Sequence, residues 1–123
     1  MFLITSQGSV APGSEKKTWH PVGVCGLTDI DWINRRAEFS LYVAPEQHRK
    51  GLGHRALNLL FAEGFGTLNL NLIWGETFKG NPAAIMFLKA GMKKEGTRRE
   101  FYYRNGIYTD AILYSIRRDE FYS

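Results

Sequence analysis

The change of residue pattern on either side of the segment QHRKGLG, residues 47–53, constrains the fold more than any other feature of this sequence. Before it, Phe39, Leu41 and Val43 alternate with polar residues, as in a β-strand whose two faces differ. After it, apolar residues recur with helical spacing from Leu52 onwards. A strand that runs through a glycine-containing loop into a helix indicates a domain in which helices pack on a sheet.

Other segments have the composition of strands or of a loop. Residues 6–20 are rich in Gly, Ser, Pro and Lys without periodicity, so we expect a loop there. Gly64 and Gly66 are expected to end the first helix. Besides the strand that ends at Val43, we expect strands at Phe2–Thr5, Val22–Thr28, Asn69–Phe78, Arg98–Tyr103 and Tyr108–Ile116.

Local signals mark a second helix and a hairpin. Asn81 is a good N-cap, Pro82 suits the first helical position, and Gly91 suits the position after the last turn. The pair Asn105-Gly106 is a strong signal for a tight β-hairpin. The whole order predicts one α/β (α+β) domain over residues 1–123, with a mixed sheet and two main helices.

Composition narrows the function classes. The formal net charge of +4 favours acidic partners, among them phosphorylated small molecules and nucleic acid. No apolar run approaches the roughly 20 residues that span a bilayer, and one cysteine, Cys25, excludes an internal disulfide. We therefore expect a cytoplasmic protein that does not bind a membrane. His48 and His54 have no acidic or cysteine partner at ligand spacing, so no metal site is expected.

The loop at the start of the first helix has the chemistry of an anion site. Free N–H groups and the dipole at a helix N-terminus attract anions. Gly51 and Gly53 let a ligand approach the backbone, and Arg49 and Lys50 add positive charge. No Gly-Lys-Ser/Thr follows and a third glycine is missing, so neither a Walker loop nor a dinucleotide fingerprint is present. The loop alone is equally consistent with a basic tight turn.

The loop and the second helix together resemble the GCN5-related N-acetyltransferase (GNAT) superfamily. That family combines a Q/R-x-x-G-x-G/A loop with an N-x-x-A-x-x-F/L-Y-x-x-x-G-F helix. This chain has His48–Gly53 and NPAAIMFLKAGM, residues 81–92. The resemblance runs from Val22 to the C-terminus. It is nearest to the branch of the ribosomal-protein N-terminal and nucleotide-amino-sugar acetyltransferases.

The resemblance implies that acetyl-CoA is the cofactor. The strand end Leu41, Tyr42 and Val43 would face the pantetheine arm, and Asn81 and Phe87 would lie near it. The acetyl group would sit where two central parallel strands splay apart. The remaining expected cofactor-binding residues, around the pyrophosphate, are His48, Arg49, Lys50, Gly51, Leu52, Gly53 and His54.

The resemblance also implies a carboxylate that takes the proton of the attacking amine. Glu76 is the first candidate and Glu38 the second. The tyrosine that often protonates the leaving thiolate falls at Leu88, so Tyr108 or Tyr114 would have to replace it. The chain is expected to lack the usual first strand and first helices, which shape the acceptor pocket.

These features predict an acetyl-CoA-dependent N-acetyltransferase in which a small-molecule or peptide amine attacks the thioester directly. The alternative is a catalytically impaired coenzyme A-binding module from a truncated acetyltransferase. Nucleic-acid binding is not expected, because the cations are scattered and no recognition motif is present. The aromatic C-terminal segment and the short N-terminus favour a homodimer. Protein N-terminus, amino sugar, polyamine and antibiotic all stay open as acceptors.

Overall fold

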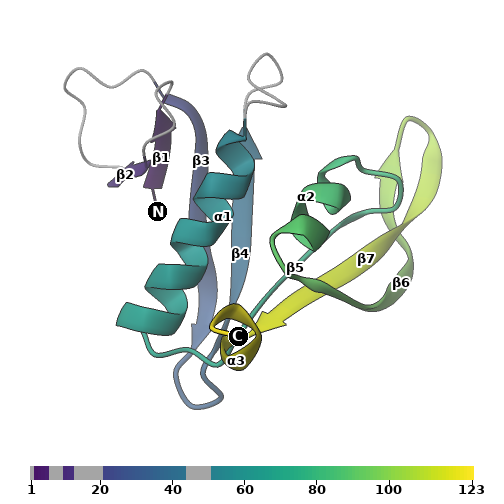
Figure 1. The fold of residues 1–123 in the computed structure, drawn as a ribbon. Helices are drawn as coiled ribbons and strands as arrows, with labels where there is room; N and C mark the ends of the chain where they lie inside the picture. Colours follow the sequence, from purple (N-terminus) through teal and green to yellow (C-terminus); the bar gives the residue numbers. More distant parts are fainter. Residues whose placement is uncertain (1, 6–9, 13–20, 44–50) are drawn as a thin grey trace.

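A computed structural model describes residues 2–5, 10–12, 21–43 and 51–123 of the chain. Within these ranges one sheet has seven strands in the order β2-β1-β3-β4-β5-β7-β6 (Figure 1). The pair β4–β5 is parallel and the other neighbouring pairs are antiparallel, so the predicted mixed sheet is confirmed. The strands are β1 (Phe2–Thr5), β2 (Val10–Pro12), β3 (Pro21–Asp31), β4 (Arg36–Val43), β5 (Leu72–Phe78), β6 (Lys93–Arg104) and β7 (Ile107–Arg117).

The segment predicted as one long loop contains a strand. β2 pairs with β1, with Ile4 opposite Val10, and so extends the sheet at its edge. A strand of three residues is too short to produce a recognisable alternation of side chains. Its position in the sheet depends on pairing with β1 rather than on its own sequence.

The two main helices are α1 (Leu52–Ala62) and α2 (Ala83–Lys89). The prediction that Gly64 ends the first helix is wrong, because the chain continues from α1 into a π-helix, η2 (Glu63–Thr67). A Cβ at Gly64 would lie 2.7 Å from Cδ1 of Ile73 and 3.2 Å from Cδ1 of Leu27. The glycine therefore allows the helix to approach the sheet, and it does not mark a stop.

The residues that cap α2 and form the hairpin turn agree with the prediction. The Ala83 N–H donates to Oδ1 of Asn81 over 3.0 Å. At the other end, Gly91 has φ 99°, and Met92 N–H donates to the Phe87 carbonyl, as in a Schellman motif. The two residues between β6 and β7, Asn105 and Gly106, both have positive φ, as a type I′ hairpin turn requires.

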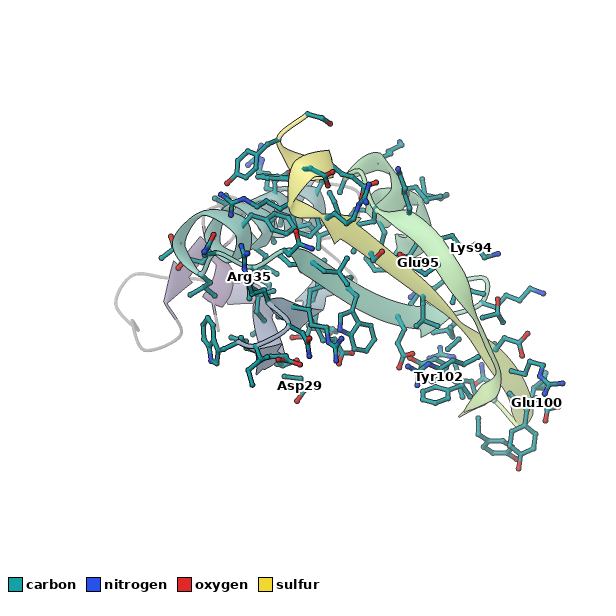
Figure 2. All side chains as sticks on the ribbon, turned by 90° about the horizontal axis from the view of Figure 1, so that it is seen from below. Asp29, Arg35, Lys94, Glu95, Glu100 and Tyr102 are labelled. Carbon is teal, nitrogen blue, oxygen red and sulfur yellow. The ribbon has the colours of Figure 1, made fainter. Side chains whose placement is uncertain are left out.

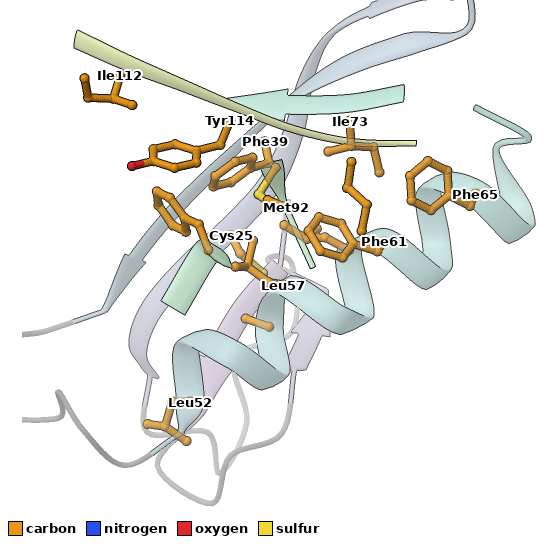
Figure 3. Packing of buried hydrophobic residues seen from close by; sticks show 14 residues of the cluster. Cys25, Phe39, Leu52, Leu57, Phe61, Phe65, Ile73, Met92, Ile112 and Tyr114 are labelled. Atoms are coloured by element: carbon orange, nitrogen blue, oxygen red, sulfur yellow. The ribbon is translucent and has the colours of Figure 1, made fainter. Parts of the chain in front are cut away.

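The apolar core lies between the sheet and the face of α1 and α2 (Figure 3). α1 contributes Leu57 and Phe61, which are fully buried, and β5 contributes Ile73. Burial of large side chains at these positions supplies most of the driving force for the layer arrangement. The other buried members are Cys25, Phe39, Leu52, Ala56, Leu60, Phe65, Phe87, Met92, Ile112, Tyr114 and Ile116.

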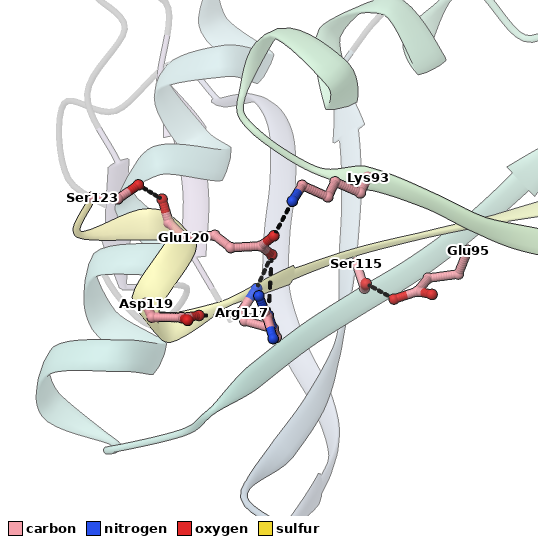
Figure 4. Close-up of polar contacts among 7 residues, drawn as sticks. All are labelled: Lys93, Glu95, Ser115, Arg117, Asp119, Glu120 and Ser123. Carbon is pink, nitrogen blue, oxygen red and sulfur yellow. Dashed lines mark hydrogen bonds and ion pairs between the residues drawn. The ribbon is translucent and has the colours of Figure 1, made fainter.

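A short C-terminal helix, α3 (Arg118–Phe121), was not predicted. Glu120 accepts the backbone N–H of Arg117 and pairs with Lys93 of β6 (Figure 4). The Phe121 ring packs against Phe61 and Phe65, at centroid distances of 5.9 and 5.5 Å. The helix has four residues, so these tertiary contacts rather than helix propensity hold it.

The parallel strands β4 and β5 diverge. Their ladder has three residue pairs and ends where Glu38 lies opposite Trp74, although both strands continue for several residues. Figure 1 shows the gap that opens between them. On the helix side of the gap the Phe39 ring lies against Gly75, where a Cβ would be 2.2 Å from the ring. The predicted splay of two central strands is thus present.

Candidate active site

Glu38 and Glu76, the two expected bases, lie on the same face of the sheet. On β4 and β5, Phe39 and Gly75 face the helices, and the alternation of strands turns Glu38 and Glu76 to the opposite face. Glu38 pairs with Trp74 in the last pair of the parallel ladder. Glu76 lies two residues after Trp74 on β5. The divergence therefore begins between the two carboxylates.

Glu76 is a mostly buried carboxylate with unused bonding capacity. Its side chain is 15% exposed, and its Oε2 atom lies 3.7 Å from Nε of Arg98. That distance is an ion pair but too long for a hydrogen bond. Oε2 is buried and has no hydrogen-bond partner in the described part of the chain. A buried carboxylate oxygen without a donor can accept a proton or an N–H group.

Glu38 sits among like charges. Burial and then the nearby Glu76 and Asp29 carboxylates raise the pKa of Glu38, and the Arg98 guanidinium acts in the opposite direction. Figure 2 places Asp29 on the side of the sheet away from the helices. The three carboxylates make this face attractive to cations.

Tyr102 also lies on this face (Figure 2), and the sequence reasoning missed it. Burial, followed by the Glu76 and Glu38 carboxylates, raises the pKa of its phenol. The ring packs edge-on against Phe78, with 6.5 Å between centroids. A β-bulge in β6 between Arg98 and Tyr102 shifts its register against β7. Alternation along β6 could not give the face of Tyr102 without the position of that bulge.

The tyrosines expected to replace the family's acid lie elsewhere. Tyr108 is 62% exposed, next to Tyr103 close to the hairpin turn. Tyr114 is buried and packs on Phe87 in the core, on the helix side. The geometry brings neither of them to the carboxylate face.

The described part of the expected cofactor loop lies at the start of α1. Gly51 has φ 76°, and a Cβ built on it would meet no described atom within 4 Å. At Gly53 a Cβ would be 2.5 Å from Sδ of Met86, so this glycine also allows α1 to pack on α2. Leu52 is buried, and the ring of partly buried His54 contacts the Asn58 amide. The remaining expected residues, His48, Arg49 and Lys50, lie outside the described residues.

The residues expected near pantetheine lie at the end of β4, in the turn before α2 and in the core. Leu41, Tyr42 and Val43 pair with β3 and lie beyond the end of the β4–β5 ladder. The Asn81 amide donates to Oγ1 of Thr77 over 2.7 Å and accepts from Ala83. Its side chain thus joins β5 to α2. Phe87 is 5% exposed, between Phe39 and Tyr114 in the core.

Comparison with protein families decides what kind of domain this is. The model of the acetyltransferase (GNAT) domain matches residues 4–93. The chain belongs to the GNAT acetyltransferase family. The family resemblance inferred from the loop and the second helix is therefore confirmed.

Relatives of this GNAT domain include several N-acetyltransferases. Spermidine N(1)-acetyltransferase of Escherichia coli (strain K12) is 35% identical over 100 residues, which are 80% of this chain and 54% of the relative. The putative ribosomal N-acetyltransferase YdaF of Bacillus subtilis (strain 168) is 30% identical over 104 residues, 80% of this chain and 54% of the relative. The chain spans about half the length of the curated relatives that it matches.

The fold of this GNAT domain agrees with solved structures. The spermidine N-acetyltransferase SpeG F149A mutant from Vibrio cholerae superposes with a TM-score of 0.79 at 30% identity. The match covers 87% of this chain and 64% of that structure. The predicted GNAT-like sheet with two main helices is therefore confirmed.

Among the described residues, no helix is both long and apolar enough to cross a bilayer. Those residues also hold no group of three or more His, Cys, Asp or Glu side chains placed to bind a metal ion.

Proposed function

We propose that this GNAT domain, as one unit over residues 1–123, transfers an acetyl group from acetyl-CoA to a primary amine. The observation that carries the proposal is the position of Glu76. A mostly buried carboxylate with an unbonded oxygen lies at the point where β4 and β5 diverge. Such a group is suited to take the proton of an amine that attacks a thioester in the gap.

Acetyl-CoA supplies the activated acetyl thioester. The amine nitrogen would form a bond to the carbonyl carbon and pass its proton to Glu76, and the carbon–sulfur bond would break to release the thiolate of coenzyme A. Glu76 would then return the proton through solvent to the sulfur, which gives the free thiol and restores the base. Backbone N–H groups of β4 near Leu41 would polarise the thioester carbonyl. Glu38, whose pKa is raised by burial and by the nearby Glu76 and Asp29 carboxylates, is the second candidate base.

The chain's own residues fit a bound coenzyme A. Gly51 has left-handed backbone, and a Cβ built on it would meet no described atom within 4 Å, which supports a pyrophosphate at the start of α1. Arg49 and Lys50 would add positive charge, with His48 and His54 beside the loop. Asn81 would act mainly by holding the turn between β5 and α2 in place through its bonds to Thr77 and Ala83. The pantetheine arm would lie along that turn.

The acceptor that we propose is a small cationic amine of the polyamine class. Spermidine N-acetyltransferases are among the relatives. The carboxylates of Asp29, Glu38 and Glu76 lie near one another on the face away from the helices, where they would attract such a cation. A peptide amine is the second acceptor class.

A coenzyme A-binding module without turnover is the second candidate function. Leu88 stands where the family often has a proton-donating tyrosine, and it is 52% exposed. We also propose a cytoplasmic homodimer that binds neither membrane nor nucleic acid. The exposed side chains Phe101, Tyr103, Ile107 and Tyr108 of the β6–β7 hairpin would supply an apolar contact.

Binding and turnover separate the two functions. Calorimetric titration of acetyl-CoA is expected to show micromolar affinity that Gly51→Glu abolishes by bulk and charge. Gly51→Ala is the matched control, because it shares the strain of a side chain at positive φ but meets no atoms within 4 Å. Absence of binding by the wild type would contradict both candidate functions.

Turnover is measured as thiol release with spermidine as acceptor. Glu76→Gln is expected to lower kcat by roughly 100-fold. Glu63→Gln, in η2, is the control for removal of a glutamate elsewhere. Binding of acetyl-CoA without thiol release for any amine tested would favour the module without turnover.

A further inference from the structure

Arg98 is placed beside the candidate base although the proposed reaction gives it no role. It lies in β6 opposite Ala111 of β7, and its Nε is 3.7 Å from Oε2 of Glu76 on β5. The guanidinium is also 5.2 Å from the centre of the Phe101 ring. A side chain from β6 thus crosses β7 to reach the carboxylate.

The contact between Arg98 and Glu76 is exchangeable. The two atoms are too far apart for a hydrogen bond, and the Arg98 side chain is 48% exposed while that of Glu76 is 15% exposed. An exposed guanidinium can rotate into solvent at small cost, because an exposed ion pair contributes little. The buried carboxylate cannot leave in the same way.

Arg98 acts on the whole group of charges that faces Glu76. These are Glu38 of β4, with Asp29 of β3 behind it, and Tyr102 of β6. Arg98 lowers the pKa of both Glu38 and Tyr102, against the burial and the carboxylates that raise them. β7 contributes the uncharged Ala111 and Leu113 at this place, and the Arg104 guanidinium stacks on the Phe78 ring at 3.6 Å.

We infer that Arg98 is an internal counter-ion whose guanidinium holds the place beside Glu76 that the ammonium group of the acceptor takes on binding. An ammonium group is smaller than a guanidinium and can donate a hydrogen bond to the unpartnered Oε2 atom. Arg98 is then a positioning and specificity-determining residue, because every cationic acceptor must replace its guanidinium beside the Glu76 carboxylate.

The inference rests on the proposed function and gives it a kinetic signature. Arg98 repels a bound ammonium group, which weakens acceptor binding. The same repulsion favours the neutral amine, which is the form that attacks the thioester. Loss of the charge is therefore expected to lower KM for a cationic acceptor and also to lower kcat.

The test compares Arg98→Gln with the wild type, using spermidine and n-butylamine as acceptors. KM for spermidine is expected to fall about three- to fivefold, and less for the monoamine, which carries fewer charges. The acidic limb of the kcat profile, which reports the bound complex, is expected to move up by roughly half a pH unit, because the bound amine keeps its proton more tightly without the Arg98 charge. Arg98→Lys keeps the charge and should resemble the wild type. Arg99→Gln, which changes an exposed neighbour in β6, is the matched control.

A second measurement does not need turnover. Spermidine is titrated into protein with carbon-13-labelled glutamate carboxyl groups, and its Kd is read from the carboxyl shifts. Tighter binding by Arg98→Gln than by the wild type supports the inference even if no amine is acetylated, in which case only the proposed function fails. Unchanged or weaker binding, or an unmoved acidic limb in an active enzyme, overturns the inference and leaves the proposed function intact.

Discussion

The Phe39 ring on β4 lies against the backbone of Gly75 on β5, where a Cβ would be 2.2 Å from the nearest ring atom. This contact lies one residue beyond the last pair of the parallel ladder on each strand. It fills the helix side of the gap at the point where the strands separate. The Phe39 ring thus leaves no space for a side chain at position 75.

Gly75→Ala is expected to lower the free energy of unfolding by about 1–3 kcal/mol, because the buried ring of Phe39 must move and cannot reach solvent. Urea unfolding measures the loss. Gly96→Ala in β6 is the control, since nothing lies within 4 Å of a Cβ there. Equal stability of the two variants would contradict the close contact.

Glu38→Gln is expected to stabilise the fold near neutral pH. The pKa of Glu38 is raised, so the folded chain holds this proton more tightly than the unfolded chain does. The favourable contribution of the protonated form is complete below the unfolded pKa and is lost as the pH rises through the folded pKa. The variant should therefore have the higher urea midpoint at pH 7, with a smaller difference in acid. A gain that is independent of pH would count against a raised pKa. Glu63→Gln is the comparison.

Leu88→Tyr is expected to increase kcat, because it supplies a phenol at the family's proton-donor position. Leu88 is 52% exposed, so a larger side chain meets no packing barrier. Ile85→Tyr, at a position of the same helix that is 60% exposed, separates proton donation from a general effect of a surface tyrosine. Thiol release under saturating substrates is the measurement. An unchanged kcat would show that the leaving thiolate needs no donor there.

Asn81→Ala is expected to cost about 1–2 kcal/mol, because the Ala83 N–H loses its cap and Thr77 loses its partner. Asn81→Asp keeps the acceptor for Ala83 but not the donor to Thr77, so it should lose less. Urea unfolding gives both values, and calorimetry tests whether affinity for acetyl-CoA falls in parallel. Wild-type stability of Asn81→Ala would contradict the capping role.

Local signals in the sequence predicted the parts of the fold that depend on local chemistry. Asn81, Gly91 and the Asn105-Gly106 pair do what their residue types favour, because caps and tight turns are decided within a few residues. Gly64 was misread because its role depends on Ile73, which is nine positions further along and on another element. A glycine that stops a helix and one that allows close packing look alike in sequence.

The shared face of the candidate residues was predictable where strand alternation holds and not where it is interrupted. The family resemblance gave Glu38 and Glu76 as candidate bases, the alternation of β4 and β5 turns both to one face, and their role stays a prediction. Arg98 and Tyr102 flank the β6 bulge, where Glu100 has φ 50° and its N–H donates to the Asp110 carboxylate. That bulge is stabilised across the hairpin, so no pattern within β6 alone indicates which residues share a face with Glu76.

The short parallel ladder has a mechanical consequence. Within the described residues, a ladder of three residue pairs joins the half of the sheet that contains β1 to β4 to the half that contains β5, β6 and β7. Packing on the helix side, which includes Phe39 against Gly75 and α2 against α1 at Met86 and Gly53, therefore contributes to the angle between the two halves. Core residues outside the proposed site would thus affect how far apart β4 and β5 stand where we propose that acetyl-CoA binds.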